Sequence, residues 1–309
     1  MSGSQSAFRV RVRPGVLPAG LRVLEQAGLE PEIGELDLEG VDALLCLLTD
    51  RIDEHVLESS DRLRLVANMA VGIDNIDLEA CARRGIAVSN TPGVLTDATA
   101  DLAFALLLAA ARRVVWGDRL VRGGGFTGWH PELGIGADVT GRTLGIVGPG
   151  RIGEAVAQRA QGFRMRVLRA GRREGAGRVE LSELLERSDF ISLHVPLSPE
   201  TRHLIGESEL QRMQKHAVLV NTARGPVVDE RALVRALRDG WIGAAGLDVF
   251  EREPRLAPGL AALTNVVLLP HLGSASVETR NRMAEVAAHN VVCALRGEPI
   301  PNAVSSVDA

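Results

Sequence analysis

The stretch TLGIVGPGRIG, residues 143–153, decides the fold of this 309-residue chain. Its first five residues are mostly apolar and predict a buried strand. Gly148, Gly150 and Gly153 follow in the spacing GxGxxG, before a helical stretch at 152–161. The first glycine permits a tight turn, the second lets a pyrophosphate approach the backbone, and the third lets the helix pack closely on the strand. The motif therefore predicts a dinucleotide site; a glycine turn with a purely structural role is the alternative.

Short apolar runs alternate with amphipathic stretches on both sides of this motif, which is typical of βα units and parallel sheets. Two series of strands are expected, at 8–12, 41–48, 64–69 and 86–89, then at 143–147, 165–168, 190–194, 218–221, 244–249 and 266–269. Short helices are expected at 20–27 and 54–58. A nearly all-apolar helix at 98–112 separates the two series, a loop-like segment follows at 122–141, and a helix at 277–296 ends the pattern.

Composition excludes several classes of protein. Hydrophobic residues make up 46% and charged residues 24% of the chain, which is ordinary for a soluble globular protein. The net charge of −4 gives no overall attraction to nucleic acid or to an anionic membrane, and the longest apolar run, 102–111, is too short to span a bilayer. Cys46, Cys81 and Cys293 form no CxxC pair. We therefore expect a cytoplasmic protein with no metal site and no nucleic-acid or membrane partner.

The segment after the glycine motif bears on the kind of dinucleotide. An NAD site normally has Asp or Glu at the end of its second strand, where the carboxylate binds the ribose 2′-hydroxyl. No acidic residue occurs from 155 to 173, and the expected strand runs into Gly171, Arg172 and Arg173. Glycine removes the repulsion of a 2′-phosphate, and arginine can pair with that phosphate. We predict a preference for NADP(H), with NAD(H) as the alternative; on the other interpretation, both arginines are solvated surface charges.

Arg224, Glu253 and His271 each follow a strand of the second series. In an open parallel sheet the ligand crevice forms at this carboxyl edge. Reduction of a 2-oxo acid needs a cation for the carbonyl and carboxylate, a proton donor for the new alkoxide, and a partner that keeps the donor protonated. Arg224, His271 and Glu253 fit these roles in turn. Taken singly, the histidine could be structural and the glutamate a surface charge, but the combination favours a catalytic set.

The motifs together resemble the D-isomer-specific 2-hydroxyacid dehydrogenases, and more narrowly the glyoxylate/hydroxypyruvate reductases. The resemblance extends from about residue 41 to residue 301, and the segment 294–299 is similar to the narrower group. The segments that carry it are AVGIDNID (70–77), VLTDATAD (94–101), GPGRIG (148–153), NTARG (221–225), LDVFEREP (247–254) and PHLGS (270–274).

The resemblance implies roles for individual residues. His271 would be the acid/base, Glu253 its partner, and Arg224 the group that binds the carboxylate and 2-oxo oxygen of the substrate. Backbone N–H groups around Val71 and Gly72 would hold the substrate carboxylate in a small nest.

Further contacts are implied as well. Asp248 would contact the nicotinamide carboxamide, Leu48 would set the substrate size from the pocket wall, and Ser274 would bind substrate. The other residues expected to contact the cofactor are Thr99, Arg151, Ile152, Val195, Pro196, Thr222, Ala223, His271 and Gly273. Trp129 matches a segment that reaches a neighbouring subunit's active site in this group, which implies a homodimer; plain interface packing is the alternative.

The fold implied is α/β, with two Rossmann-like doubly wound parallel-sheet domains and an interdomain active-site cleft. Residues 1–98 with 281–309 would form a discontinuous substrate domain, and residues 99–280 the dinucleotide-binding domain. The activity implied is NADPH-dependent reduction of glyoxylate or hydroxypyruvate to the D-2-hydroxy acid. The segments 173–181 and 24–41 are shorter than the resemblance predicts.

Three alternatives remain open for the activity. The first is a 2-ketogluconate reductase or another D-2-hydroxyacid dehydrogenase. The second is a phosphoglycerate dehydrogenase, which is less favoured because no regulatory domain follows Ala309. The third is a non-catalytic dinucleotide-sensing protein, which the combination of Arg224, Glu253 and His271 argues against.

Overall fold

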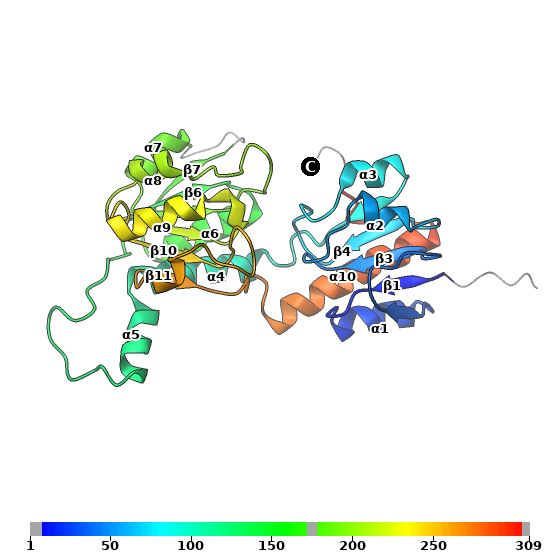
Figure 1. Cartoon of the computed structure of the whole chain (residues 1–309), viewed down its shortest axis with the longest axis horizontal. Helices are drawn as coiled ribbons and strands as arrows, with labels where there is room; N and C mark the ends of the chain where they lie inside the picture. Colours follow the sequence, from blue (N-terminus) through cyan, green and yellow to red (C-terminus); the bar gives the residue numbers. More distant parts are fainter. Residues whose placement is uncertain (1–7, 172–177, 305–309) are drawn as a thin grey trace, which may run out of the picture. The chain divides into compact units, whose positions relative to one another are not determined.

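The computed structural model describes residues 8–171 and 178–304. The chain divides into two compact units: residues 1–95 with 275–309 form unit 1, and residues 96–274 form unit 2. Within these described ranges each unit contains one sheet, and the pairings between its strands are parallel (Figure 1). The predicted fold class, two α/β units built on parallel sheets, is confirmed.

The sheet of unit 1 has the strand order β2-β1-β3-β4-β5. Its strands are β1 (Val10–Val12), β2 (Pro31–Ile33), β3 (Ala43–Cys46), β4 (Leu65–Asn68) and β5 (Ala87–Ser89). Its helices are α1 (Pro18–Gln26), α2 (Glu54–Glu58), α3 (Leu78–Arg83) and α10 (Val277–Arg296). Successive strand side chains point to opposite faces, so Leu45 belongs to the core shared with α1 and α10, and Leu44 to the core shared with α2 and α3. Figure 1 shows these two pairs of helices on the two sides of the sheet.

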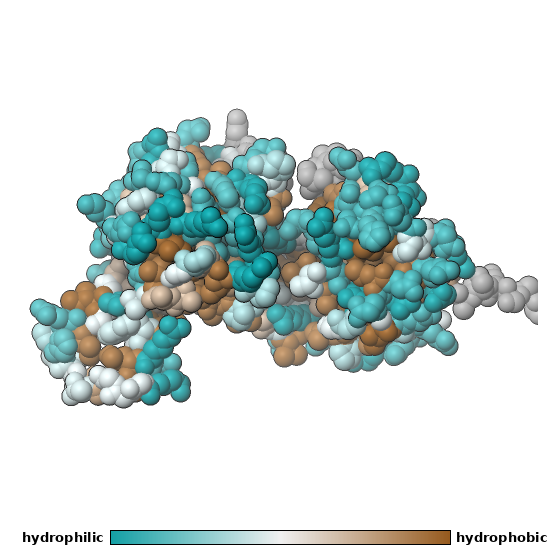
Figure 2. Space-filling view, viewed as in Figure 1, coloured by the Kyte–Doolittle hydropathy of each residue, from teal (hydrophilic) through white to brown (hydrophobic). Residues whose placement is uncertain are grey.

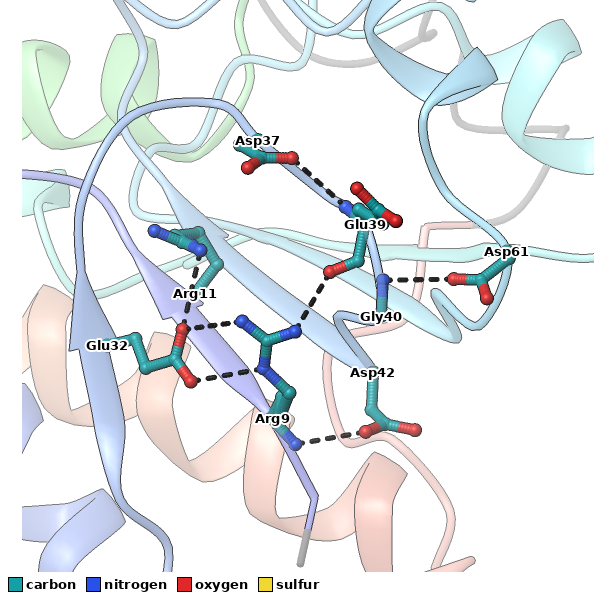
Figure 3. A network of polar contacts seen from close by, with 8 residues as sticks. All are labelled: Arg9, Arg11, Glu32, Asp37, Glu39, Gly40, Asp42 and Asp61. Atoms are coloured by element: carbon teal, nitrogen blue, oxygen red, sulfur yellow. Dashed lines mark hydrogen bonds and ion pairs between the residues drawn. The ribbon is translucent and has the colours of Figure 1, made fainter.

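The edge strand β2 is held by a network of arginines and carboxylates (Figure 3). Glu32 accepts hydrogen bonds from Arg9 Nε at 3.1 Å and Nη2 at 3.0 Å, and from Arg11 Nη2 at 3.4 Å. The Arg9 N–H donates to the buried carboxylate of Asp42 at 3.0 Å. The sequence PEI is too short and too polar to show a strand pattern, and sequence reasoning places no strand in the segment 24–41.

The sheet of unit 2 has the order β11-β10-β9-β8-β6-β7. Its strands are β6 (Thr143–Val147), β7 (Arg166–Ala170), β8 (Phe190–Leu193), β9 (Val218–Asn221), β10 (Ala244–Leu247) and β11 (Val266–Leu268). Its helices are α4 (Thr96–Ala111), α5 (Val114–Arg122), α6 (Arg151–Gly162), α7 (Leu181–Arg187), α8 (Glu207–Arg212) and α9 (Glu230–Asp239), with short 3₁₀ turns η1 (Gly225–Val227) and η2 (Leu260–Ala262). α4 and α6 cover one face, and α7, α8 and α9 the other.

The apolar helix α4 lies very close to the sheet. A Cβ on Gly246 of β10 would be 3.1 Å from Leu106 Cβ, so glycine allows the helix to approach the strand. The helix has little hydrophobic asymmetry because it is apolar nearly all round, which is typical of a buried helix. Its position supports the strands whose carboxyl ends carry the candidate site.

The strand order of unit 2 creates a switch point beside β6. The chain passes from β6 to β7 on one side and then crosses to β8 on the other. Ligands bind at the carboxyl ends of strands where the order reverses in this way. The glycine motif follows β6 directly, so it lies at that point.

The helix α5 and the segment that follows it, 123–142, extend away from the sheet of unit 2 (Figure 1). The loop predicted at 122–141 is confirmed, but the helix α5 was not predicted. Within residues 8–171 and 178–304, no helix is long and apolar enough to cross a membrane.

Candidate active site

The glycine motif forms the turn that its spacing predicts. Gly148 has a φ of +86°, a conformation that favours glycine, and its N–H donates to the Ala170 carbonyl at 2.8 Å. A Cβ on Gly153 would lie 2.5 Å from the Gly148 carbonyl oxygen, so this glycine allows α6 to pack against the turn. A Cβ on Gly150 would meet nothing within 4 Å. The N-terminus of α6 has no side-chain cap, and it is therefore suited to receive a phosphate.

The end of β8 meets the glycine turn. The Cβ that Gly148 lacks would lie 2.8 Å from both the His194 carbonyl and Val195 Cγ1. Pro196 continues this strand end, and Arg151 and Ile152 form the first residues of α6. The structure thus brings these predicted cofactor residues to the switch point of one sheet.

A second group of predicted cofactor residues gathers around Asp248. This carboxylate is 1% exposed and accepts hydrogen bonds from the N–H groups of Leu272 at 2.7 Å and Gly273 at 2.8 Å. The Thr99 hydroxyl donates to the Gly273 carbonyl at 3.1 Å. Burial raises the pKa of the Asp248 carboxyl, although the two N–H donors and His271 oppose this. Asp248 therefore fixes the turn that carries His271, whatever else it contacts.

The turn after β9 is built by Asn221. Its side-chain oxygen accepts from the Ala223 N–H at 3.0 Å, and its amide nitrogen donates to the Arg224 carbonyl at 2.9 Å. A Cβ on Gly225 would overlap the backbone of Phe250, so only glycine lets this turn lie against the segment that leads to Glu253. The buried Thr222 hydroxyl has no hydrogen-bond partner among the residues described. An orphaned buried donor at this edge is a group that a bound cofactor could satisfy.

His271 and Glu253 form a pair. His271 Nδ1 lies 3.1 Å from Glu253 Oε2, and the other carboxylate oxygen of Glu253 accepts from the Phe250 N–H at 3.0 Å. His271 has a φ of +56°, and its N–H donates to the Asp248 carbonyl at 2.9 Å. The side chains of His271 and Glu253 remain 28% and 36% exposed, so a small molecule can reach them.

The Glu253 carboxyl is held in its ionised form. Burial alone would raise its pKa, but hydrogen bonds from His271 and from the Phe250 N–H, together with the charges of His271 and Arg224, lower that pKa below the ordinary value. An ionised carboxylate beside the imidazole stabilises the imidazolium. The arrangement can therefore deliver a proton from His271 and keep the resulting ring oriented.

Sequence reasoning missed Glu230, which supports this pair from α9. Its buried carboxylate accepts from the N–H groups of Glu251 at 3.1 Å and Ala257 at 2.9 Å. It thus ties together the two ends of the segment that carries Glu253. The sequence gives no signal for this, because a glutamate in the first turn of an amphipathic helix is usually exposed.

The remaining predicted residues are more scattered. Leu48, Val71 and Gly72 belong to unit 1, where Leu48 is 37% exposed; their role in substrate binding stays a prediction. Ser274 is the last residue of unit 2. Trp129, in the segment after α5, is 81% exposed. Among the residues described, no group of histidine, cysteine, aspartate or glutamate is arranged to hold a metal ion.

The structure describes only part of the segment that follows β7. Arg172 and Arg173 lie outside the described residues, so their role stays a prediction. Gly171 is described, and a Cβ there would be 2.7 Å from Pro149 Cδ and 3.3 Å from Arg178 Nη2. Sequence reasoning did not single out Arg178, which is seven residues from Gly171 in the segment noted as short.

Known proteins with similar sequences include members of one family of dehydrogenases. A model of the family "D-isomer specific 2-hydroxyacid dehydrogenase, NAD binding domain" matches residues 104–273. A glyoxylate reductase of Korarchaeum cryptofilum is 58% identical over 275 residues, which cover 85% of this chain and 82% of that protein.

Two solved structures are also similar. A protein of Thermus thermophilus has a TM-score of 0.91 and 48% identity, covering 96% of this chain and 100% of that one. An NADPH-dependent glyoxylate/hydroxypyruvate reductase of Sinorhizobium meliloti, in complex with NADP and malonate, has a TM-score of 0.88 and 33% identity, covering 97% of each chain.

Proposed function

Because this chain belongs to the D-isomer specific 2-hydroxyacid dehydrogenases, we propose that it reduces glyoxylate or hydroxypyruvate to the D-2-hydroxy acid with NADPH. The observation that carries the proposal is the His271–Glu253 pair at 3.1 Å, on the unit whose sheet also carries the glycine turn. The names of similar proteins support the substrate class, since they include glyoxylate reductases and an NADPH-dependent glyoxylate/hydroxypyruvate reductase.

The residues present fit a nicotinamide dinucleotide. The open helix N-terminus at Gly150 suits the pyrophosphate, and the orphaned hydroxyl of Thr222 and the carboxylate of Asp248 offer polar contacts further along the edge. When bound, the cofactor supplies a hydride to C2 of the 2-oxo acid.

The chain's own residues supply the rest of the chemistry. Arg224 orients the substrate carboxylate and 2-oxo oxygen, and its positive charge stabilises the oxygen as negative charge develops there. His271 gives its proton to that oxygen, and Glu253 holds the imidazole through Nδ1, leaving Nε2 to face the substrate. Val71 and Gly72 bind the carboxylate, with Leu48 and Ser274 near the substrate.

Residues 99–280 would be the dinucleotide-binding domain, and residues 1–98 with 281–309 the substrate domain. The protein would prefer NADP(H) through Gly171, Arg172 and Arg173, and would form a homodimer. The three cysteines are free and buried, which favours a reducing compartment such as the cytoplasm.

A steady-state assay tests the proposed activity. Loss of NADPH and of NADH absorbance is followed with glyoxylate, hydroxypyruvate, 2-ketogluconate and pyruvate. We expect the highest kcat/KM with NADPH and either glyoxylate or hydroxypyruvate. Faster turnover with NADH would keep the reaction and reject the cofactor preference. Faster turnover of 2-ketogluconate would replace the substrate, and no turnover with any pair would reject the proposal.

A further inference from the structure

Arg178 lies beside the end of β7. It forms a single parallel bridge with Arg169, and the N–H of the next residue, Val179, donates to the Arg169 carbonyl at 3.0 Å. This short pairing places Arg178 along the outer edge of the sheet. Its guanidinium reaches forward to Gly171, where a Cβ would be 3.3 Å from Nη2.

The guanidinium of Arg178 is buried and unpaired within the described part of the chain. Both terminal nitrogens are shielded from solvent and have no hydrogen-bond partner there. The neighbouring Arg169 is different, because its Nε and Nη2 bind the two oxygens of Glu154 at 2.8 and 2.9 Å. Shielding a charge that has no partner among the described residues is costly, so the arrangement favours a bound anion beside Arg178.

The position of this charge identifies the anion. In a dinucleotide-binding sheet, the end of the second strand receives the ribose of the adenosine, and a carboxylate there binds the 2′-hydroxyl of NAD. Here the position is Gly171, and any side chain would crowd Pro149, since a Cβ would be 2.7 Å from its Cδ. The Arg178 guanidinium lies beside this position, and its paired N–H donors match phosphate oxygens.

We propose that Arg178 binds the 2′-phosphate of NADP(H) and is a determinant of the preference for this cofactor over NAD(H). The proposal rests on the proposed function, since it assumes that the glycine turn holds a dinucleotide.

The test measures binding of two adenosine fragments, with no turnover involved. Titration calorimetry compares 2′,5′-ADP with 5′-AMP for the full-length wild type, Arg178→Gln and Arg166→Gln. Arg166 is the matched control, because it is exposed at the opposite end of the same strand. We expect Arg178→Gln to weaken 2′,5′-ADP binding by about 10- to 100-fold and 5′-AMP binding by less than about twofold, while Arg166→Gln changes neither.

Thermal unfolding separates this role from a structural one. Without ligand, Arg178→Gln should melt at the same temperature as the wild type or higher, because it removes an uncompensated charge. Added 2′,5′-ADP should raise the melting temperature of the wild type but not that of the variant. Arg178→Lys, which keeps the charge without the fork of donors, should bind 2′,5′-ADP with an intermediate affinity.

Several outcomes would overturn the assignment. They are equal affinity of the wild type for both fragments, equal loss of both in Arg178→Gln, or a wild-type affinity for 2′,5′-ADP in that variant. The outcome of this binding test is independent of whether the protein catalyses the proposed reaction. A wild type that prefers 2′,5′-ADP through Arg178 but reduces no 2-oxo acid supports the assignment and rejects the reaction, and the converse pattern rejects Arg178 alone.

Discussion

At the residue scale, the pairing of His271 with Glu253 leads to the first prediction. Changing His271 to glutamine removes the proton donor but leaves the glycine turn untouched, so kcat should fall by about 10²- to 10⁴-fold while the Kd for NADPH stays within about twofold. His216→Gln is the matched control, because His216 also pairs with a carboxylate, that of Asp189 at 2.7 Å, but before β9 rather than after it. Stopped-flow reduction of glyoxylate and NADPH titration measure the two quantities. A wild-type kcat in His271→Gln would remove the histidine from the mechanism.

A second residue-scale prediction concerns His194, at the end of β8. Burial lowers its pKa from 6.5 to about 4, and its Nε2 lies 2.8 Å from Ser192 Oγ. In the unfolded chain the ring takes up a proton near pH 6.5, whereas in the folded chain it does so only near pH 4. The stability that neutral His194 contributes is therefore complete above pH 6.5 and is lost progressively as the pH falls toward 4.

Urea unfolding between about pH 4 and pH 7 measures this effect. The free energy of unfolding should fall more steeply with acid in the wild type than in His194→Gln, which has no titrating ring. Carboxylates such as Glu253, whose pKa is lowered by its hydrogen bonds and nearby positive charges, also take up protons as the pH falls, but they do so in both proteins. Parallel curves for the two proteins would show that His194 does not titrate in this way.

At the element scale, α9 positions the segment that carries Glu253. Replacing Glu230 with alanine leaves the half-buried N–H groups of Glu251 and Ala257 without their acceptor, which should cost about 1 to 3 kcal/mol of unfolding free energy. Because Glu253 then loses its orientation toward His271, kcat should fall by about tenfold, with little change in the Kd for NADPH. Glu230→Gln retains one acceptor oxygen and should lie between alanine and wild type. Reduced stability with an unchanged kcat in Glu230→Ala would show a purely structural role for Glu230.

Some elements of this fold can be predicted from the sequence and others cannot. The strand 143–147, the strand 218–221 and the helix 277–296 have the predicted bounds, because each is a strongly apolar or periodic segment with a clear stop. The three-residue strand β2 has no sequence pattern of its own. It forms by parallel pairing with β1, and the contacts of Glu32 with Arg9 and Arg11 reinforce that pairing.

In the candidate site, too, some residues could be predicted from the sequence and others could not. Arg224, Glu253 and His271 could be selected because polar residues directly after strands of a parallel sheet converge at one edge. Glu230 and Arg178 could not, because their roles depend on burial: one is buried with two backbone donors, the other with no partner among the described residues. Burial of a charged side chain is a property of the tertiary fold, and neighbouring residues in the sequence give no sign of it.

At the scale of the whole molecule, the apolar surface of unit 2 bears on assembly. Exposed apolar side chains gather on α5 and the segment that follows it (Figure 2). They are Val114, Val121, Phe126, Trp129 and Ile135, each more than half exposed. A concentration of this kind on an extended segment is typical of a surface that meets another protein chain. The homodimer proposed above would make a second copy of the chain that partner.

Changing Phe126 and Trp129 together to serine should therefore convert a dimer into a monomer. Light scattering after size exclusion measures the mass, and Val277→Ser is the matched control, because Val277 is 72% exposed on α10 of unit 1. A monomeric wild type, or a dimeric double variant, would contradict the assignment of this surface.

The single variant Trp129→Ala separates the two roles considered for Trp129, a contact with the partner's active site and packing at the interface. If Trp129 reaches the partner's site, kcat/KM for glyoxylate should fall by about tenfold or more in a protein that is still dimeric, because a substrate contact is lost without loss of the interface. If Trp129 only packs at the interface, kcat/KM should fall only in proportion to the fraction of monomer, and raising the protein concentration should restore it.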